Sequence, residues 1–167
     1  MRDEGPLERT FEAKMYQLLA SEDARRSLRK AARLAAAGFP QKIDEDTRRR
    51  LSPTAVVACG KVRTSGGLEP EVIATLLGMD AREYRAADEH PDGAFLNAEQ
   101  FDRAALLIEI YMTLVQLFVG QMAFSWPRLP NNGPLFGGRS AIELMQRDGL
   151  ASMREVFGHL QALALGL

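Results

Sequence analysis

The sequence predicts an all-α protein, and two observations carry this prediction. Apolar residues recur at three- and four-residue steps along most of the chain, which is the spacing of one helix face. Ser and Asn residues that can cap a helix precede several of these segments. No segment is a strand candidate bounded by turn residues. The 167 residues, 46% of them hydrophobic, suit one ordinary domain or two very small ones and exclude wholesale disorder.

Two helices are expected before residue 40. The apolar face of the first consists of four regularly spaced residues: Leu7, Phe11, Met15 and Leu18. Ser21 predicts the start of the second, because its hydroxyl can accept a hydrogen bond from a free backbone N–H group. Residues 24–37 are rich in Ala, the strongest helix former, and Gly38-Phe39-Pro40 should end the segment.

The next helices are predicted by turn residues. Ser52-Pro53 combines a capping Ser with a Pro at the first helical position, and this helix should end near residues 64–67. Residues 69–77 and 81–89 are two short helices separated by a break at Gly78.

One long helix is expected in the middle of the chain. Asn97 with Gln100 three residues later is a capping box that opens it, and Trp126-Pro127 ends the region. Its face is strongly apolar, which makes it the central core helix, a dimer face, or both. The residues of that face are Leu107, Ile110, Tyr111, Leu114, Leu117, Phe118 and Gln121.

The C-terminal third combines a loop with two helices. Residues 128–138 hold too many Pro and Gly to be helical. Ser140 and Glu143 form a second capping box, which opens a short helix that Asp148-Gly149 closes. Residues 150–165 are the last helix. Residues 160–167 carry no charged side chain, so this end should fray or dock on another surface.

Charge and composition exclude several classes of protein. The formal net charge of −1 is the sum of +3 over residues 1–50, −4 over residues 51–100 and zero over the rest. A single Cys excludes an internal disulfide, and two His with that Cys do not make a zinc site. The apolar runs are too short to cross a membrane and no signal peptide is evident, so we expect a soluble, cytoplasmic protein.

An enzyme is not expected. His90, His159 and Cys59 lie on three separate elements, and the sequence has no glycine-rich phosphate loop and no carboxylate pair at catalytic spacing. We expect no cofactor and no metal.

Residues 70–89 fit the frame of a helix-turn-helix. With Pro70 as the first position, the positions that such a unit buries are all apolar or aromatic: Ile73, Leu77, Met79, Tyr84 and Ala87. Ala74 is small enough for the helix crossing, and Gly78 suits a turn with positive φ. An ordinary helical hairpin with a Gly turn is the alternative interpretation.

The outward face of the second helix of this unit is a poor match to DNA. It offers Arg82 and Arg85, the two candidate DNA contacts, but also four acidic residues that phosphates would repel. These are Asp80, Glu83, Asp88 and Glu89. Any affinity for DNA would have to come from elsewhere, such as the basic residues of the first 50 or dimerisation.

The C-terminal third resembles a known domain. Its pattern is a Trp, a Pro-Asn pair, a Phe-Gly-Gly-Arg-Ser turn, an aliphatic helix, a Gly and a closing helix, and it occupies residues 126–131, 135–145 and 149–167. This pattern is similar to the toxin-binding domain of Xre/MbcA/ParS-type antitoxins. The resemblance extends upstream over the helix-turn-helix and the long helix, to about residue 51.

The resemblance implies a type II antitoxin that binds and silences a RES-like toxin, an enzyme that consumes NAD or transfers ADP-ribose from it. In that family the C-terminal domain covers the active-site cleft of the toxin, and the helical N-terminal domain dimerises and often binds the promoter of its own operon. The residues that match the toxin-facing positions are Asn131, Phe136, Gly137, Gly138, Arg139, Ser140, His159, Leu163, Leu165, Gly166 and Leu167.

The expected organisation follows from this resemblance. Residues 1–50 are a helical extension, residues 51–122 hold the helix-turn-helix and a linker or dimerisation helix, and residues 123–167 are the toxin-binding domain. The expected partners are a RES-like toxin, possible operator DNA and a second copy of the chain. A DNA-binding regulator without a toxin, or a purely structural dimer module, are the alternatives.

Overall fold

The computed structural model describes residues 6–38 and 43–167, and this part of the chain is helical, without strands. It contains nine α-helices and two short 3₁₀ helices. Their bounds are α1 (Pro6–Leu18), α2 (Glu22–Ala36), α3 (Glu45–Gly66), α4 (Pro70–Leu77), α5 (Ala81–Glu89), η1 (Pro91–Gly93), α6 (Ala98–Leu117), α7 (Met122–Ser125), η2 (Trp126–Arg128), α8 (Ala141–Asp148) and α9 (Leu150–Ala164).

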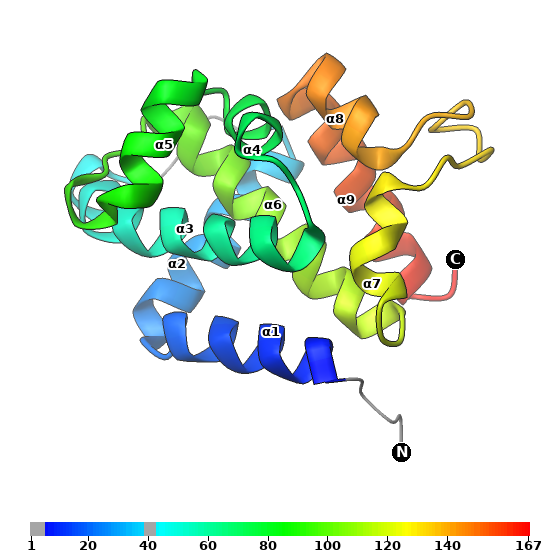
Figure 1. Cartoon of the computed structure of the whole chain (residues 1–167), viewed down its shortest axis with the longest axis horizontal. Coiled ribbons are helices and arrows are strands. Elements are labelled where there is room, and N and C mark those ends of the chain that lie inside the picture. Colours follow the sequence, from blue (N-terminus) through cyan, green and yellow to red (C-terminus); the bar gives the residue numbers. More distant parts are fainter. Residues whose placement is uncertain (1–5, 39–42) are drawn as a thin grey trace.

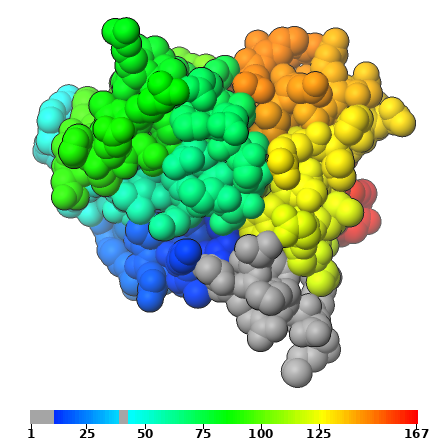
Figure 2. Space-filling model, viewed as in Figure 1, coloured from blue at the N-terminus to red at the C-terminus, as the bar shows by residue number. Residues whose placement is uncertain are grey.

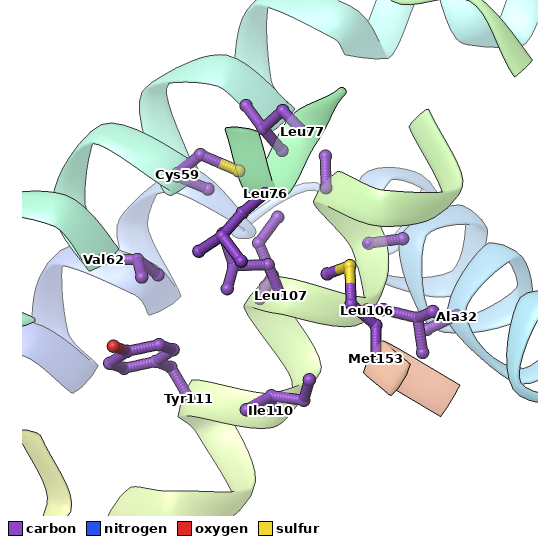
Figure 3. Packing of buried hydrophobic residues seen from close by; sticks show 14 of the residues in the cluster. Ala32, Cys59, Val62, Leu76, Leu77, Leu106, Leu107, Ile110, Tyr111 and Met153 are labelled. Carbon is purple, nitrogen blue, oxygen red and sulfur yellow. The ribbon is translucent and has the colours of Figure 1, made fainter. Parts of the chain in front are cut away.

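Helix α6 runs through the middle of the molecule, and the other long helices pack around it (Figure 1). Its Leu106, Leu107 and Ile110 are fully buried. They lie in one cluster with residues of α2, α3, α4 and α9 (Figure 3). The face that the sequence assigned to a core or a dimer interface therefore belongs, over most of its length, to the core of this chain.

Local capping chemistry determines several helix starts. The Ser21 hydroxyl accepts from the Ala24 N–H at 3.4 Å, and the predicted capping boxes of α6 and α8 are both present. At α8, Ser140 Oγ accepts from the Glu143 N–H at 3.1 Å, while the Glu143 carboxylate accepts from the Ser140 N–H at 2.7 Å. These starts are confirmed because their signal is contained in three or four consecutive residues.

The predicted start of α3 at Ser52-Pro53 is wrong. The helix begins at Glu45, where the Asp44 carboxylate accepts from the Thr47 N–H at 2.8 Å. Pro53 lies inside the helix. The Ser52 hydroxyl donates to the Arg48 carbonyl oxygen at 2.6 Å and accepts from the Leu96 N–H at 2.9 Å, so its capping capacity serves a tertiary contact. The expected boundary after residue 50 falls within this helix.

Two further helix ends differ from the prediction or lie outside the described residues. The apolar region was expected to continue to Trp126-Pro127, but α6 ends at Leu117. Gly120, with φ 65°, separates it from the short α7. At the end of α2, Ala37 is the C-cap and Gly38 has φ 73°, whereas Phe39-Pro40 lie outside the described part of the chain.

Helices α4 and α5 pack against each other across a short turn. Gly78 ends α4 with φ 70°, as the sequence predicted. The first, second and fourth of the five positions expected to be buried, Ile73, Leu77 and Tyr84, are completely buried. The other two, Met79 and Ala87, are partly buried and pack against the core.

In the part of the chain that the structure describes, no helix is both long enough and apolar enough to cross a membrane.

Candidate partner-binding surface

The loop between η2 and α8 is closed by its own backbone. The Asn131 N–H donates to the Arg139 carbonyl oxygen at 3.1 Å, and the Gly138 N–H donates to the Asn131 carbonyl oxygen at 2.9 Å. Inside the loop, the Asn131 side-chain oxygen accepts from the Gly133 N–H at 2.8 Å. These bonds give residues 131–139, here called the Asn131 loop, one defined shape without the help of a partner.

Two glycines make this closure possible. Gly137 and Gly138 have φ values of 57° and 84°, which residues with a side chain rarely adopt. A Cβ atom on Gly137 would meet nothing within 4 Å, and one on Gly138 would meet only the Asn132 side-chain oxygen at 3.8 Å. The glycines are therefore required by the turn and not by crowding, and their exposed backbone is open to a partner.

An aromatic cluster packs around Phe136 and supports the Asn131 loop. The ring of Phe136 lies edge-on to Trp126 and to His159, with centroid distances of 5.7 and 5.3 Å. Trp126 stacks on His159 at 6.5 Å and on Phe118 at 5.9 Å. The four rings come from the loop, η2, α9 and the end of α6, so they join the loop to both helices. Sequence reasoning missed this cluster because no periodic pattern links four separate elements.

The candidate toxin-facing residues of this region divide into two groups. Phe136 is 1% exposed and Ser140 is 4% exposed, so their side chains support the loop and cap α8. The Asn131 side chain is engaged within the loop, and the His159 ring lies within the aromatic cluster. Arg139 is exposed, as are the two glycines beside it.

The end of α9 and the residues after it form an exposed apolar tail. Leu163, Leu165 and Leu167 are 40%, 75% and 86% exposed. Gly166 turns the chain with φ 74°. His159, one helical turn before Leu163 on α9, stacks on Trp126 of η2. The tail therefore leaves α9 close to η2.

Two more exposed apolar side chains, Val119 and Met122, lie before and within α7. In Figures 1 and 2 the tail emerges on the side of the molecule formed by α7. Leu129, at the end of η2, is a further apolar side chain of this part of the chain, and it is 46% exposed. The most exposed of the apolar side chains are Leu165 and Leu167, so the tail is the clearest candidate for an interaction site.

The Arg candidates on α5 lie among acidic groups. Arg85 forms an ion pair with Glu71 of α4. Asp80 caps α5 by accepting from the Arg82 and Glu83 N–H groups, both at 2.8 Å. Arg82 is exposed.

Asp88 fixes the other side of α5 to α3. Its carboxylate lies 3.2 Å from the Arg63 guanidinium and accepts from the Tyr84 hydroxyl at 3.4 Å.

Desolvation by burial, with the nearby charge of Asp88, raises the pKa of the Cys59 thiol to about 12, so this thiol is not a nucleophile at neutral pH. Among the described residues, no group of three or more His, Cys, Asp or Glu could hold a metal ion.

A partly buried arginine of α6, Arg103, lies between α4 and the turn between α8 and α9. The Arg103 guanidinium pairs with Glu99 at 2.6 Å and donates to the Leu76 carbonyl oxygen at 3.5 Å. A Cβ atom on Gly149 would lie 2.8 Å from Arg103 Nη2, and one on Gly78 would lie 3.3 Å from Arg103 Cζ. Both glycines therefore leave room for the same cation. No sequence pattern had indicated this contact.

A closed loop and an exposed apolar tail lie in the C-terminal third of this helical molecule. No family model, curated protein or solved structure matches the chain.

Proposed function

We propose that this protein is an antitoxin that neutralises a RES-like toxin by direct binding with its C-terminal third. The observation that carries the proposal is the exposed apolar tail, with Leu165 and Leu167 at 75% and 86% exposure beside a preformed loop. Burying one Leu side chain against a partner contributes roughly 1.5–3 kcal/mol to association. Three such residues at alternate positions, Leu163, Leu165 and Leu167, can anchor the tail in an apolar groove.

The Asn131 loop supports the proposal in a different way. Its backbone hydrogen bonds and the ring of Phe136 hold it in one conformation before any partner arrives. A preorganised loop loses little conformational entropy on binding, so contacts made by Arg139 and the two glycine backbones would translate more fully into affinity. The planar guanidinium of Arg139 suits a carboxylate or phosphate on the partner.

Co-expression with the protein encoded by the adjacent gene tests the proposal. A double substitution, Leu165→Asp with Leu167→Asp, should abolish growth protection and capture of the toxin, because it places charge in the buried contact. The matched control is Tyr16→Asp with Phe95→Asp, two apolar side chains that are 53% and 40% exposed on other elements. Full protection by the tail variant, or equal loss in the control, would contradict the proposal.

Removing the whole tail by truncating the chain after Gly158 would be a poorer test of the proposal than these point substitutions. A truncated chain would lose Leu160, which is completely buried, and the ring of His159. Loss of protection would then report unfolding of the C-terminal third as readily as loss of a contact. The adjacent gene is itself informative, because an open reading frame with RES-like residues would supply the expected partner.

Promoter binding through α5 is the weaker alternative. It is supported by the positive φ of Gly78 and the burial of Tyr84, which suit a helix-turn-helix. It is opposed by the ion pair of Arg85 with Glu71. A mobility shift on the chain's own promoter at low salt, lost in Arg82→Gln with Arg85→Gln, would support this role, and the absence of any shift would remove it.

A further inference from the structure

The strongest positive charge of the described chain lies on α2, outside both surfaces discussed above. We propose that the exposed face of α2 binds the phosphate backbone of duplex DNA without reading its sequence. The helix carries five basic residues and only two acidic ones, and the acidic residues stand at its first two positions. The basic residues are Arg25, Arg26, Arg29, Lys30 and Arg33.

The basic side chains share one face because the opposite face of α2 is packed against the core. The buried residues of the helix are Ala24, Leu28, Ala31, Ala32 and Ala35. At 1.5 Å per residue, the distance along the axis from Arg26 to Arg33 is about 10 Å. The phosphates of one DNA strand rise 3.4 Å each along the duplex axis, so this length covers about three such steps when α2 lies parallel to that axis.

Only part of this charge is neutralised within the molecule. Arg26 pairs with Glu22 at 2.8 Å, but both side chains are about four-fifths exposed, and such pairs contribute little. Arg29 lies 3.7 Å from the Glu109 carboxylate. Within the described residues, neither Lys30 nor Arg33 has a carboxylate inside 4.0 Å, but the charge of Arg33, like that of Arg29, acts on the nearby Glu109 carboxylate. The phosphates of DNA would therefore meet a face whose net charge is positive, with Lys30 as its least compensated cation.

The long basic side chains of α2 enclose open space between them. All five border a volume of about 560 Å³ that is lined by residues of this one helix, Glu22 among them. The basic residues are mostly arginines, whose planar fork suits phosphate oxygens. None of the large hydrophobic side chains that are exposed belongs to α2, whereas a helix that lies on a membrane presents Trp, Phe or Leu on its apolar face. These features favour nucleic acid over a lipid surface.

Variants that remove two positive charges from α2 or from α5 can be compared in the full chain. Anisotropy of a short labelled DNA duplex of arbitrary sequence, measured over a series of salt concentrations, yields the slope of log affinity against log salt. Lys30→Gln with Arg33→Gln should reduce the magnitude of that slope by about 2, because each lost phosphate contact removes about 0.9. Arg82→Gln with Arg85→Gln removes the same charge from α5 and should leave the slope unchanged.

A second variant keeps the test independent of the contact between α2 and α6. Arg26→Gln with Lys30→Gln leaves Arg29 and Arg33 beside Glu109 untouched and should also reduce the slope by about 2. Neither α2 variant should weaken toxin neutralisation, so this inference and the proposed function can fail separately.

Three results would overturn the inference. The first is no binding of the duplex by the wild-type chain at low salt. The second is a loss of binding in the α5 variant with none in the α2 variants. The third is that wild-type chain binds vesicles of anionic lipid and not the duplex, which would reassign the basic face to a membrane surface.

Discussion

The Asn131 loop and the C-terminal tail were both expected to face a partner, yet they are built in opposite ways. The loop is polar and Gly-rich, and its own hydrogen bonds and the ring of Phe136 determine its shape. The tail is apolar, and Leu165 and Leu167 are largely exposed. The proposed binding surface would therefore combine a loop that has its final shape before association with a tail that gains its packing only from the partner.

Removing the aromatic support of the loop should give the largest effect. Phe136→Ala deletes a ring that is 1% exposed and that contacts Trp126 and His159, so we expect it to lower the free energy of unfolding by about 3–5 kcal/mol. Leu165→Ala should change it by less than about 0.5 kcal/mol. Chemical denaturation of both variants measures the difference. Equal values would show that loop and tail are not built differently.

The glycines of the two segments allow a finer comparison. Gly138 and Gly166 both have positive φ, 84° and 74°. Gly138→Ala should cost about 1–2 kcal/mol, because the closed loop cannot relax away from the left-handed conformation. Gly166→Ala should cost far less, since the tail can unwind into solvent. Thermal unfolding of the two variants is the measurement, and a large loss in the tail variant would indicate that the tail is held by contacts of its own.

The smallest effect concerns pH at the end of the loop. The backbone N–H of Ser140, followed by its side chain, lowers the pKa of the Glu143 carboxyl. A lowered pKa in the folded state means that this carboxylate stabilises the fold above its unfolded pKa, and that the contribution is lost as the pH falls through the folded pKa. Wild type should therefore be more stable than Glu143→Gln at neutral pH and lose that advantage in acid. A constant difference across the titration would argue against this capping role.

Sequence reasoning succeeded where a structure is encoded locally. The capping boxes at Asn97 and Ser140, and the turn at Gly78, each depend on a few neighbouring residues. It failed at Ser52-Pro53, because the same pair that suits a helix start is used inside α3 to hold the Leu96 backbone. The actual N-cap of α3, Asp44, is also a local signal. Nothing in the sequence shows which of the two capping residues starts the helix.

The candidate site shows the same division. Of the positions that the resemblance assigned to a partner, Arg139 and the tail are exposed, whereas Phe136 and Ser140 are buried. The support of the loop by Trp126 and His159 could not be predicted, since it depends on how η2 and α9 meet in space. The basic charge of α2 was evident as a run in the sequence, but its gathering on one face requires the opposite face to be buried.

The position of Arg103 has an evolutionary consequence. Its guanidinium occupies the space that a side chain at Gly78 or Gly149 would need, although the three positions are far apart in the chain. A lineage that replaces either glycine must displace this flexible guanidinium, and the displacement draws the cation away from the Leu76 carbonyl oxygen. Substitutions at the two glycines should therefore favour a shorter side chain at position 103, and relatives in which the three positions vary independently would indicate that α4 and α8 pack differently.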